Sequence, residues 1–210
     1  MGSRTHRPVL KAVYLPETIE RIENNAFQGQ YELLESNLDY LANSSNPVLT
    51  YLGDHAYGGF GGGLWGYTLM QVRCEKLPDT VTSIGMNCFY YGGPNIRLTQ
   101  LPENLETLAS WSFVNCINLQ ITKFGSDNPD SKFTYIQDST FKMSNRSNFN
   151  PANNTIYLGT SIRKIGDEVF NNYGSTSLIL KVPYSPDGGA DCYYNNPEGL
   201  SAGDIGVGSI

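Results

Sequence analysis

The sequence predicts a mostly β repeat protein, a solenoid with short strands on one face and short helical turns or loops on the other. A motif recurs six times, and its copies are 24 to 32 residues apart, which is the spacing of stacked repeat units. Several copies also follow an extended run that ends in Leu-Pro. We number the repeats 1 to 6 by their central residues, which are Ile22, Leu52, Ile84, Leu108, Ile136 and Ile165.

The motif is best developed in residues 77–89, LPDTVTSIGMNCF. An apolar residue precedes the central Ile or Leu by three positions, and a small residue followed by an aromatic comes four and five positions after it. The segment is too short to be a stable helix by itself, so we expect a single turn that packs its aromatic inward. The six aromatics are Phe27, Tyr57, Phe89, Phe113, Phe141 and Phe170.

Leu-Pro pairs end the predicted strands that enter repeats 1, 3 and 4, seven residues before the central residue. Pro cannot donate to a strand ladder, which suits the end of a strand. Because side chains alternate along a strand, the residue before each such Leu points outward. The resulting row is a candidate binding surface, with the register of the fifth unit left open and a plain solvated face as the alternative. Its members are Tyr14, Lys76, Gln100, Lys123, Tyr157 and Lys181.

Two further segments interrupt the repeats. Residues 31–41 place Leu34, Leu38 and Leu41 at helical spacing, which predicts a short helix. Residues 58–67, GGFGGGLWGY, lack the Gly-Lys-Ser/Thr of a phosphate loop and the βαβ setting of a dinucleotide site. We interpret them as a loop between repeats. A sharper hypothesis makes Phe60, Trp65 and Tyr67 a binding tip on that loop.

The motif resembles the BspA-like, Treponema pallidum-type leucine-rich repeat. The resemblance is carried by Val81 to Phe89, by Leu105 to Phe113 with Cys116 and Leu119, and by Ile162 to Phe170. It covers about residues 10–183, and repeats 2 and 5 depart from it by lacking the Leu-Pro pair. The resemblance implies a leucine-rich-repeat solenoid, and it implies a recognition or adhesion module exposed outside the cell, where similar proteins bind matrix proteins or host cells.

The predicted organisation is one repeat domain over residues 10–183, a polar lead-in over 1–9 and a C-terminal cap or tail over 184–210. Val182-Pro183 followed by Tyr193-Tyr194 resembles the closing segment of the family. Residues 1–7 precede no apolar region, so we expect no signal peptide in this chain. We also expect no membrane insertion, because the sequence holds no apolar run of about 18 residues.

The composition narrows the function classes. A net charge of −6 disfavours a nucleic-acid partner, since phosphate binding needs a clustered basic face. The histidines are His6 and His55, and no hydrolase, zinc-protease or paired-cysteine motif occurs, so we predict no enzyme activity, no cofactor and no metal. We interpret Cys88 and Cys116 as buried free thiols, with a bridge between them as the alternative; the states of Cys74 and Cys192 stay open.

The leading hypothesis is therefore a non-catalytic adhesion scaffold on the cell surface or outside the cell, which binds a protein or glycan. The fourteen tyrosines suit such contacts, although many of them also suit strands. The alternative is a structural component of a larger assembly such as a virus or phage particle, with a homo-oligomer or an assembly partner. The low charged fraction of 16% fits either hypothesis.

Overall fold

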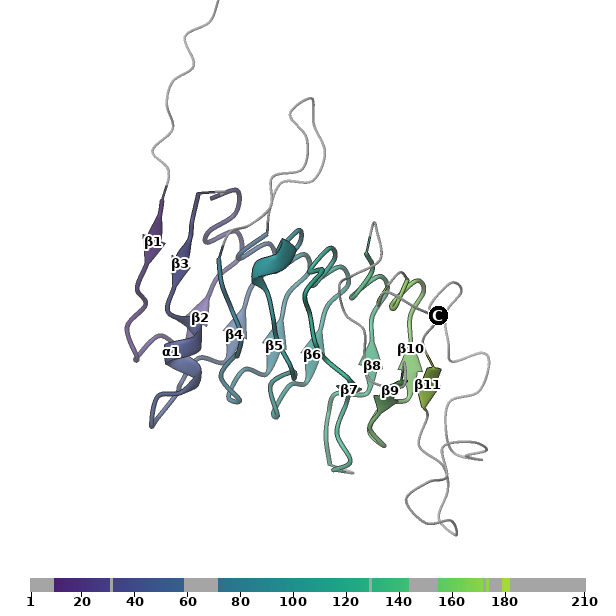
Figure 1. Cartoon of the computed structure of the whole chain (residues 1–210). Helices are drawn as coiled ribbons and strands as arrows, with labels where there is room; N and C mark the ends of the chain where they lie inside the picture. The colour runs from purple at the N-terminus through teal and green to yellow at the C-terminus, as the bar shows by residue number, and fades with distance from the viewer. Residues whose placement is uncertain are drawn as a thin grey trace, which may run out of the picture.

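The computed structural model describes residues 10–30, 32–58, 72–128, 130–143, 155–171, 173 and 179–181. The regular elements in these residues are short parallel strands, one short α-helix and one 3-10 turn, η1 (Gly93–Asn95). Successive repeats form coils that lie side by side along the chain (Figure 1). The phrase "junction 4/5" below means the boundary between the coils of repeats 4 and 5, and other junctions are named likewise.

The central residues of the repeats lie in one register. The strands β2 (Arg21–Ile22), β4 (Tyr51–Leu52), β5 (Ser83–Ile84) and β6 (Thr107–Leu108) form a parallel sheet that pairs the first four central residues. A second parallel pair, β8 (Tyr135–Ile136) and β10 (Lys164–Ile165), aligns the last two. This central ladder confirms the phase of the repeat.

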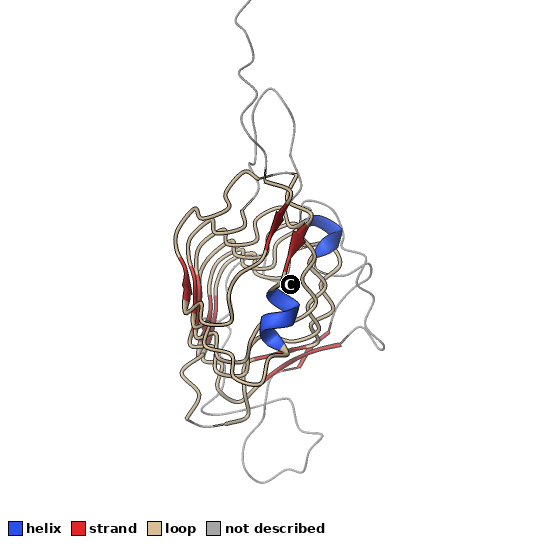
Figure 2. Cartoon of the chain, turned by 90° about the vertical axis from the view of Figure 1, so that its left-hand side faces the viewer, coloured by secondary structure: helices blue, strands red, loops and turns tan. Residues whose placement is uncertain are grey.

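A second set of strands lies on another side of the coils. It contains β1 (Ala12–Val13) paired with β3 (Glu35–Ser36), an isolated bridge between Cys74 and Ile96, and the parallel sheet of β7 (Lys123–Phe124), β9 (Thr155–Leu158) and β11 (Ile179–Lys181). Figure 2 shows strands on separate sides of the cross-section. The expectation of strands on one face is thus corrected, because several coils have a second extended segment that pairs with that of a neighbouring coil.

The predicted helix over residues 31–41 is also corrected. Glu35 and Ser36 form β3, and the helix α1 is confined to Leu38–Ala42. Leu38 and Leu41 are buried as a helical face, but Leu34 is 54% exposed. Asn37 Oδ1 accepts the main-chain N–H of Leu15 at 2.7 Å, and Asn37 Nδ2 donates to Leu15 O at 2.8 Å. These two hydrogen bonds join the segment of repeat 2 just before α1 to repeat 1.

The six motif aromatics form a continuous stack through the interior. Neighbouring ring centroids are 5.1, 5.6, 5.2, 5.6 and 6.0 Å apart from Phe27 to Phe170, and the last four ring pairs are within 12° of parallel. Such offset ring pairs add stabilisation beyond the burial of their apolar area. All members except Phe27, in the first coil, are buried. We call this row the aromatic spine, and it confirms that the aromatics point inward.

A left-handed backbone recurs three residues after each central residue. The six residues have φ between 53° and 65°, although none is Gly; they are Asn25, His55, Asn87, Trp111, Ser139 and Glu168. The main-chain N–H groups of the first five bond the next coil, as His55 does with Met86 O at 2.8 Å. This conformation is uncommon outside Gly and Asn, so the inter-coil bonds must hold it. The His55 side chain is half-buried, and its Nε2 lies 3.4 Å from Asn87 Nδ2.

Glycine follows the central residue where coils approach most closely. A Cβ on Gly85 would lie 2.5 Å from the main-chain nitrogen of Asp54 in the preceding coil, and Gly53 is equally close to Asn24. A side chain at Gly53 or Gly85 would therefore need a shift of the neighbouring main chain, which favours a very small residue at this position.

Cys74, Cys88 and Cys116 are free and buried, in agreement with the thiols expected at Cys88 and Cys116. Burial in apolar surroundings raises the pKa of each thiol, since the thiolate loses its hydration there.

Candidate functional site: the cavity at junction 4/5

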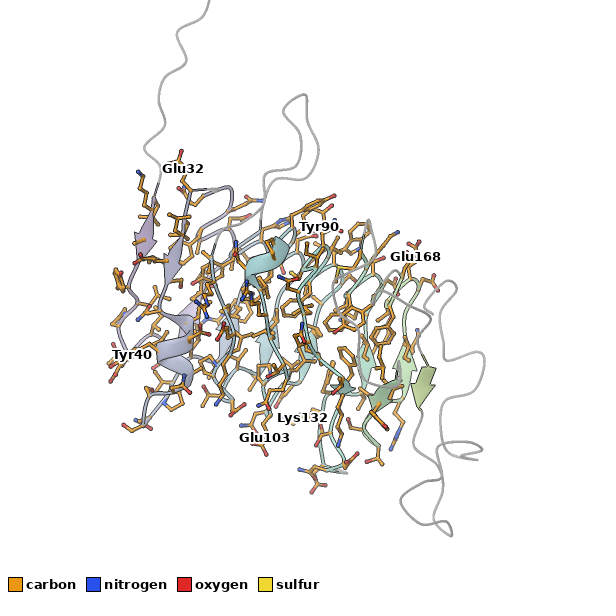
Figure 3. The ribbon with its side chains drawn as sticks, in the orientation of Figure 1. Glu32, Tyr40, Tyr90, Glu103, Lys132 and Glu168 are labelled. Carbon is orange, nitrogen blue, oxygen red and sulfur yellow. The ribbon has the colours of Figure 1, made fainter. Side chains whose placement is uncertain are left out.

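A cavity of about 510 Å³ opens at junction 4/5. One wall comes from residues 99–105 of repeat 4, and the other comes from the segment 122–133 of repeat 5. Glu103 projects from the lower edge of the stack in Figure 3, on the opposite edge from Tyr90. The size is typical of ligand sites in proteins.

The central strands of repeats 4 and 5, β6 and β8, do not pair at this junction. At junctions 1/2, 2/3, 3/4 and 5/6 the residue after the central residue donates its N–H to the previous central carbonyl; an example is Gly85 to Leu52 at 2.8 Å. The equivalent bond from Gln137 to Leu108 does not form among the described residues. The same is true two positions before the central residue, where Glu106 N donates to Thr82 O but Thr134 N has no equivalent bond to repeat 4 among the described residues.

The residue at position 137 contributes to this lapse. Gln137 occupies the place of Gly53, Gly85 and Gly166, where a Cβ would collide with the previous coil. Ala109 keeps its ladder bond to Ile84, at 3.0 Å, so a methyl group is accommodated. The larger Gln137 instead reaches across with its amide, and its Oε1 accepts the N–H of Ser110 at 3.2 Å. A side-chain bond thus replaces the main-chain bond.

The corner of repeat 5 is also longer than that of repeat 4. Four positions separate Leu101 from Leu105 in repeat 4, whereas nine separate Phe124 from Phe133 in repeat 5. Within this longer corner, Gly125, Ser126, Asp127 and Ser131 line the cavity and form its outer wall.

The coils nevertheless stay joined at this junction by other contacts. The spine continues, with the rings of Phe113 and Phe141 5.6 Å apart and 7° from parallel. The turns also remain bonded, as Phe113 N donates to Thr140 O at 2.9 Å. On the surface, Lys132 Nζ lies 2.7 Å from Glu106 Oε1. The cavity therefore lies within a supported structure.

The outer wall is tied to repeat 6. Ser161, which is buried, accepts the N–H of Ser126 at its Oγ at 3.0 Å and donates that hydroxyl to Phe133 O at 2.9 Å. Ser161 N also donates to Ser126 O at 2.9 Å. Gly125 is in a left-handed conformation with φ of 81°, and a Cβ there would meet the Ile162 side chain at 2.5 Å. These contacts preorganise the wall.

Three charged side chains line the cavity, namely Glu103, Lys123 and Asp127. Lys123 Nζ lies 2.5 Å from Asp127 Oδ2, and this hydrogen bond lowers the pKa of the Asp127 carboxyl, with the N–H of Thr160 acting in the same direction. Glu103 is exposed and forms no ion pair with any residue that the structure describes. The lining therefore has one unneutralised negative charge.

The cavity brings together two members of the predicted row, Gln100 and Lys123. The others are elsewhere. Tyr14 is 71% exposed, and its hydroxyl donates to Glu35 Oε2 at 2.5 Å, which raises the pKa of the phenol. Lys76 Nζ lies 3.8 Å from Asp79 Oδ2. These two side chains are engaged within their own part of the stack.

The strand pairing gives the register of the fifth unit, which the sequence left open for the predicted row. Lys123 pairs with Tyr157, and Tyr157 pairs with Lys181, so the last three members of the row share one ladder. Tyr157 is 38% exposed. The predicted loop tip, Phe60, Trp65 and Tyr67, lies outside the described residues.

Sequence reasoning did not select Glu103, Ser126 or Ser161 as site residues. Glu103 directly follows a Leu-Pro pair and resembles an ordinary surface residue. The available signal was the unusual length of the corner at residues 125–132, which the sequence marks as a surface loop without showing that it borders a cavity.

The comparison with protein families gives a match over the part of the chain that contains repeats 3 to 6. The family description "BspA type leucine-rich repeat region" matches residues 71–186 with six copies. The chain belongs to this family. Leucine-rich repeats commonly mediate protein contacts, so membership indicates a protein-binding scaffold. The match begins in repeat 3, yet the structure pairs the central residues of repeats 1 and 2 with that of repeat 3 in the same register.

No curated protein and no solved structure matches the chain significantly. Within the described residues, no helix has the length and apolar character needed to cross a bilayer. No group of three or more His, Cys, Asp or Glu side chains suited to a metal ion occurs in that same part of the chain.

Proposed function

We propose that this chain is a non-catalytic scaffold, displayed outside the cell, that holds a protein ligand in the cavity at junction 4/5. The repeats form one continuous solenoid in this proposal, and the aromatic spine keeps the cavity walls in place. The family supports a protein-binding role. The observation that carries the choice of site is that two predicted binding residues, Gln100 and Lys123, meet in one cavity.

A protein ligand suits the lining better than a glycan does. The walls combine apolar side chains, Leu101, Leu105 and Phe133, with the charged Glu103 and Lys123. Protein interfaces likewise combine an apolar core with a polar rim. A sugar would instead need an exposed aromatic platform. On the described surface the most exposed aromatic side chains are Tyr14, Tyr40, Trp111 and Tyr157, and none of them lines the cavity.

The test compares matched surface variants on immobilised extracellular-matrix proteins and on a glycan array. The double variant Gln100→Ala, Lys123→Ala alters the cavity, and Lys164→Ala on β10 alters another exposed lysine as the control. We expect the wild-type chain and Lys164→Ala to retain at least one protein, and the double variant to bind it at least about tenfold more weakly. Equal binding by both variants, retention of glycans alone, or self-association without any retained protein contradicts the proposal.

A further inference from the structure

Strand β7 is the terminal strand of its sheet and faces the cavity. The sheet order is β11-β9-β7, so β9 covers one edge of β7 and repeat 4 lies beyond the other. Lys123 of β7 lines the cavity. The edge toward repeat 4 carries no strand among the described residues. A free strand edge can pair with another chain.

The pairing of β7 with β9 shows which main-chain groups are free. Thr122 O accepts the N–H of Tyr157 at 2.8 Å, and Phe124 O accepts the N–H of Gly159 at 2.6 Å. Because successive residues of a strand direct their main-chain groups to opposite edges, the N–H and C=O of Lys123 point away from β9. They therefore point toward repeat 4 and the cavity.

The opposite wall is also open. The main-chain bond from Gln120 N to Leu98 O, 2.9 Å long, joins the coils just before the cavity. Beyond it, the main-chain groups of Thr99, Gln100 and Leu101 make no hydrogen bond within the described part of the chain. Both walls of the cavity thus contain main-chain groups that make no hydrogen bond within the described part of the chain.

We propose that the cavity receives an extended segment of a partner protein, which pairs its main chain with the open edge of β7. This inference rests on the proposed protein-binding function and specifies how the ligand is held. Addition of a strand to a sheet edge is a general mode of peptide recognition, in which main-chain bonds give affinity and side-chain pockets give selectivity. At junction 3/4 the second set of strands is joined by the isolated bridge between Cys74 and Ile96, where Arg97 N donates to Cys74 O at 2.8 Å.

The charges select the kind of segment. Lys123 and Asp127 pair with one another, while Glu103 has no ion-pair partner among the described residues. A bound segment with one Lys or Arg side chain would neutralise the remaining negative charge, and a segment with Glu or Asp there would be repelled. The occupant is thus an extended segment that carries a basic residue.

The probes are three capped pentapeptides of the same length. The first is acetyl-Thr-Val-Lys-Val-Thr-amide, the second replaces its Lys with Glu, and the third is the Lys peptide with alternate main-chain nitrogens methylated so that one strand edge cannot donate. Each is titrated to millimolar concentration into the full ¹⁵N-labelled chain, and amide shifts are followed. We expect the Lys peptide to shift the amides of Gln100 and Lys123 in a saturable way. We expect the Glu and methylated peptides to bind at least about fivefold more weakly.

Two variants separate the main-chain group of residue 123 from its side chain. Lys123→Pro removes the outward N–H, a change that an edge strand tolerates because that N–H is not in the ladder. Lys123→Met keeps the N–H and removes the charge. We expect about fivefold weaker binding of the Lys peptide by the folded proline variant than by the methionine variant.

Equal binding of the Lys peptide by the folded proline and methionine variants overturns the inference, as does equal binding of the parent and methylated peptides. Unchanged Gln100 and Lys123 amides at millimolar Lys peptide also overturn it, even where a matrix protein still binds in the array test and the proposed function stands. If the proline variant does not fold, the comparison of the Lys peptide with its methylated form tests the inference by itself. A peptide response at residue 123 without any array binding supports the edge pairing and counts against the proposed function.

Discussion

Junctions 3/4 and 4/5 join the same kind of repeat in different ways. At 3/4 the strands β5 and β6 pair in register, and the spine rings of Phe89 and Phe113 stack 5.2 Å apart. At 4/5 the rings of Phe113 and Phe141 stack almost as closely, at 5.6 Å, but the central strands do not pair. The interior stacking is thus independent of the strand ladder. A repeat protein can open its ladder at one junction while its core stays continuous.

The difference identifies where binding capacity comes from in this chain. The paired junction satisfies its main-chain groups internally, so it has none to offer a partner at the ladder. The open junction keeps such groups available on walls that the spine and Ser161 hold in place. Because the scaffold is rigid around the unpaired groups, it loses little conformational entropy on binding, which favours affinity.

The largest expected effect is the loss of a spine ring at the open junction. Phe113→Ala removes a fully buried aromatic and should lower the free energy of unfolding by about 3–5 kcal/mol. Because the spine is the main interior contact there, repeats 5 and 6 should lose amide protection before repeats 1 to 3. Chemical denaturation with hydrogen exchange measures both effects. The control is the exposed Trp111→Ala, expected to cost less than about 1 kcal/mol; a similar cost for both variants would contradict the role of the spine.

Opening a closed junction should have the next largest effect. Gly85→Gln places at junction 2/3 the residue that occupies the same position at 4/5, and its Cβ would lie 2.5 Å from Asp54 N. The overpacked site should cost about 1–3 kcal/mol and weaken the bond to Leu52 O. Thermal unfolding and the exchange rate of the residue 85 amide report it. The reciprocal variant, Gln137→Gly, removes the obstruction; a fully protected amide in Gly85→Gln would show that the side chain does not open the ladder.

Removing the hydrogen bonds that hold the outer wall of the cavity should lower the free energy of unfolding by less. Ser161→Ala removes the acceptor of the Ser126 N–H and the donor to Phe133 O, which should destabilise the chain by about 1–2 kcal/mol. We expect faster exchange at Ser126 with the spine amides unchanged. The matched control is Thr107→Ala on β6, whose side chain is exposed and lies away from this wall. Unchanged exchange at Ser126 would mean that the wall has another anchor.

The smallest effect concerns pH. The Lys123 hydrogen bond lowers the pKa of Asp127 below its ordinary value of 3.8, so the folded chain gains stability from this carboxylate above that pH. The gain is lost as pH falls through the lowered pKa, where the carboxyl is protonated. An NMR titration of the carboxyl carbon should give a midpoint below 3.8, and Lys123→Met should raise it. The same midpoint in both proteins would contradict the pairing.

The sequence was sufficient for the parts of the fold that depend on periodic apolar residues. The central residues and the spine were predictable because each repeat buries the same two positions, such as Ile84 and Phe89. The strand of repeat 2 was missed because Leu38 lies fourteen residues before Leu52, twice the usual separation, with α1 in between. The left-handed positions were missed because residues as different as Asn25, Trp111 and Glu168 occupy them.

The candidate site was only partly predictable. Period-two alternation selected Gln100 and Lys123, and both line the cavity. The cavity itself follows from two local departures, Gln137 in a glycine position and the long corner of repeat 5. Each departure is visible in the sequence, but their joint effect depends on the distance between coils, which the sequence does not state.

Amide hydrogen exchange of the intact chain, residue by residue, tests most directly whether the core continues where the ladder lapses. The account predicts strong protection for Gly85 and Ala109, which bond the previous coil, and for Phe113 and Phe141 in the spine turns. It predicts rapid exchange for Lys123 and Gln137, which face the open junction. Protection of these two amides equal to that of Gly85 would mean that the ladder is closed at junction 4/5, and the account would be wrong.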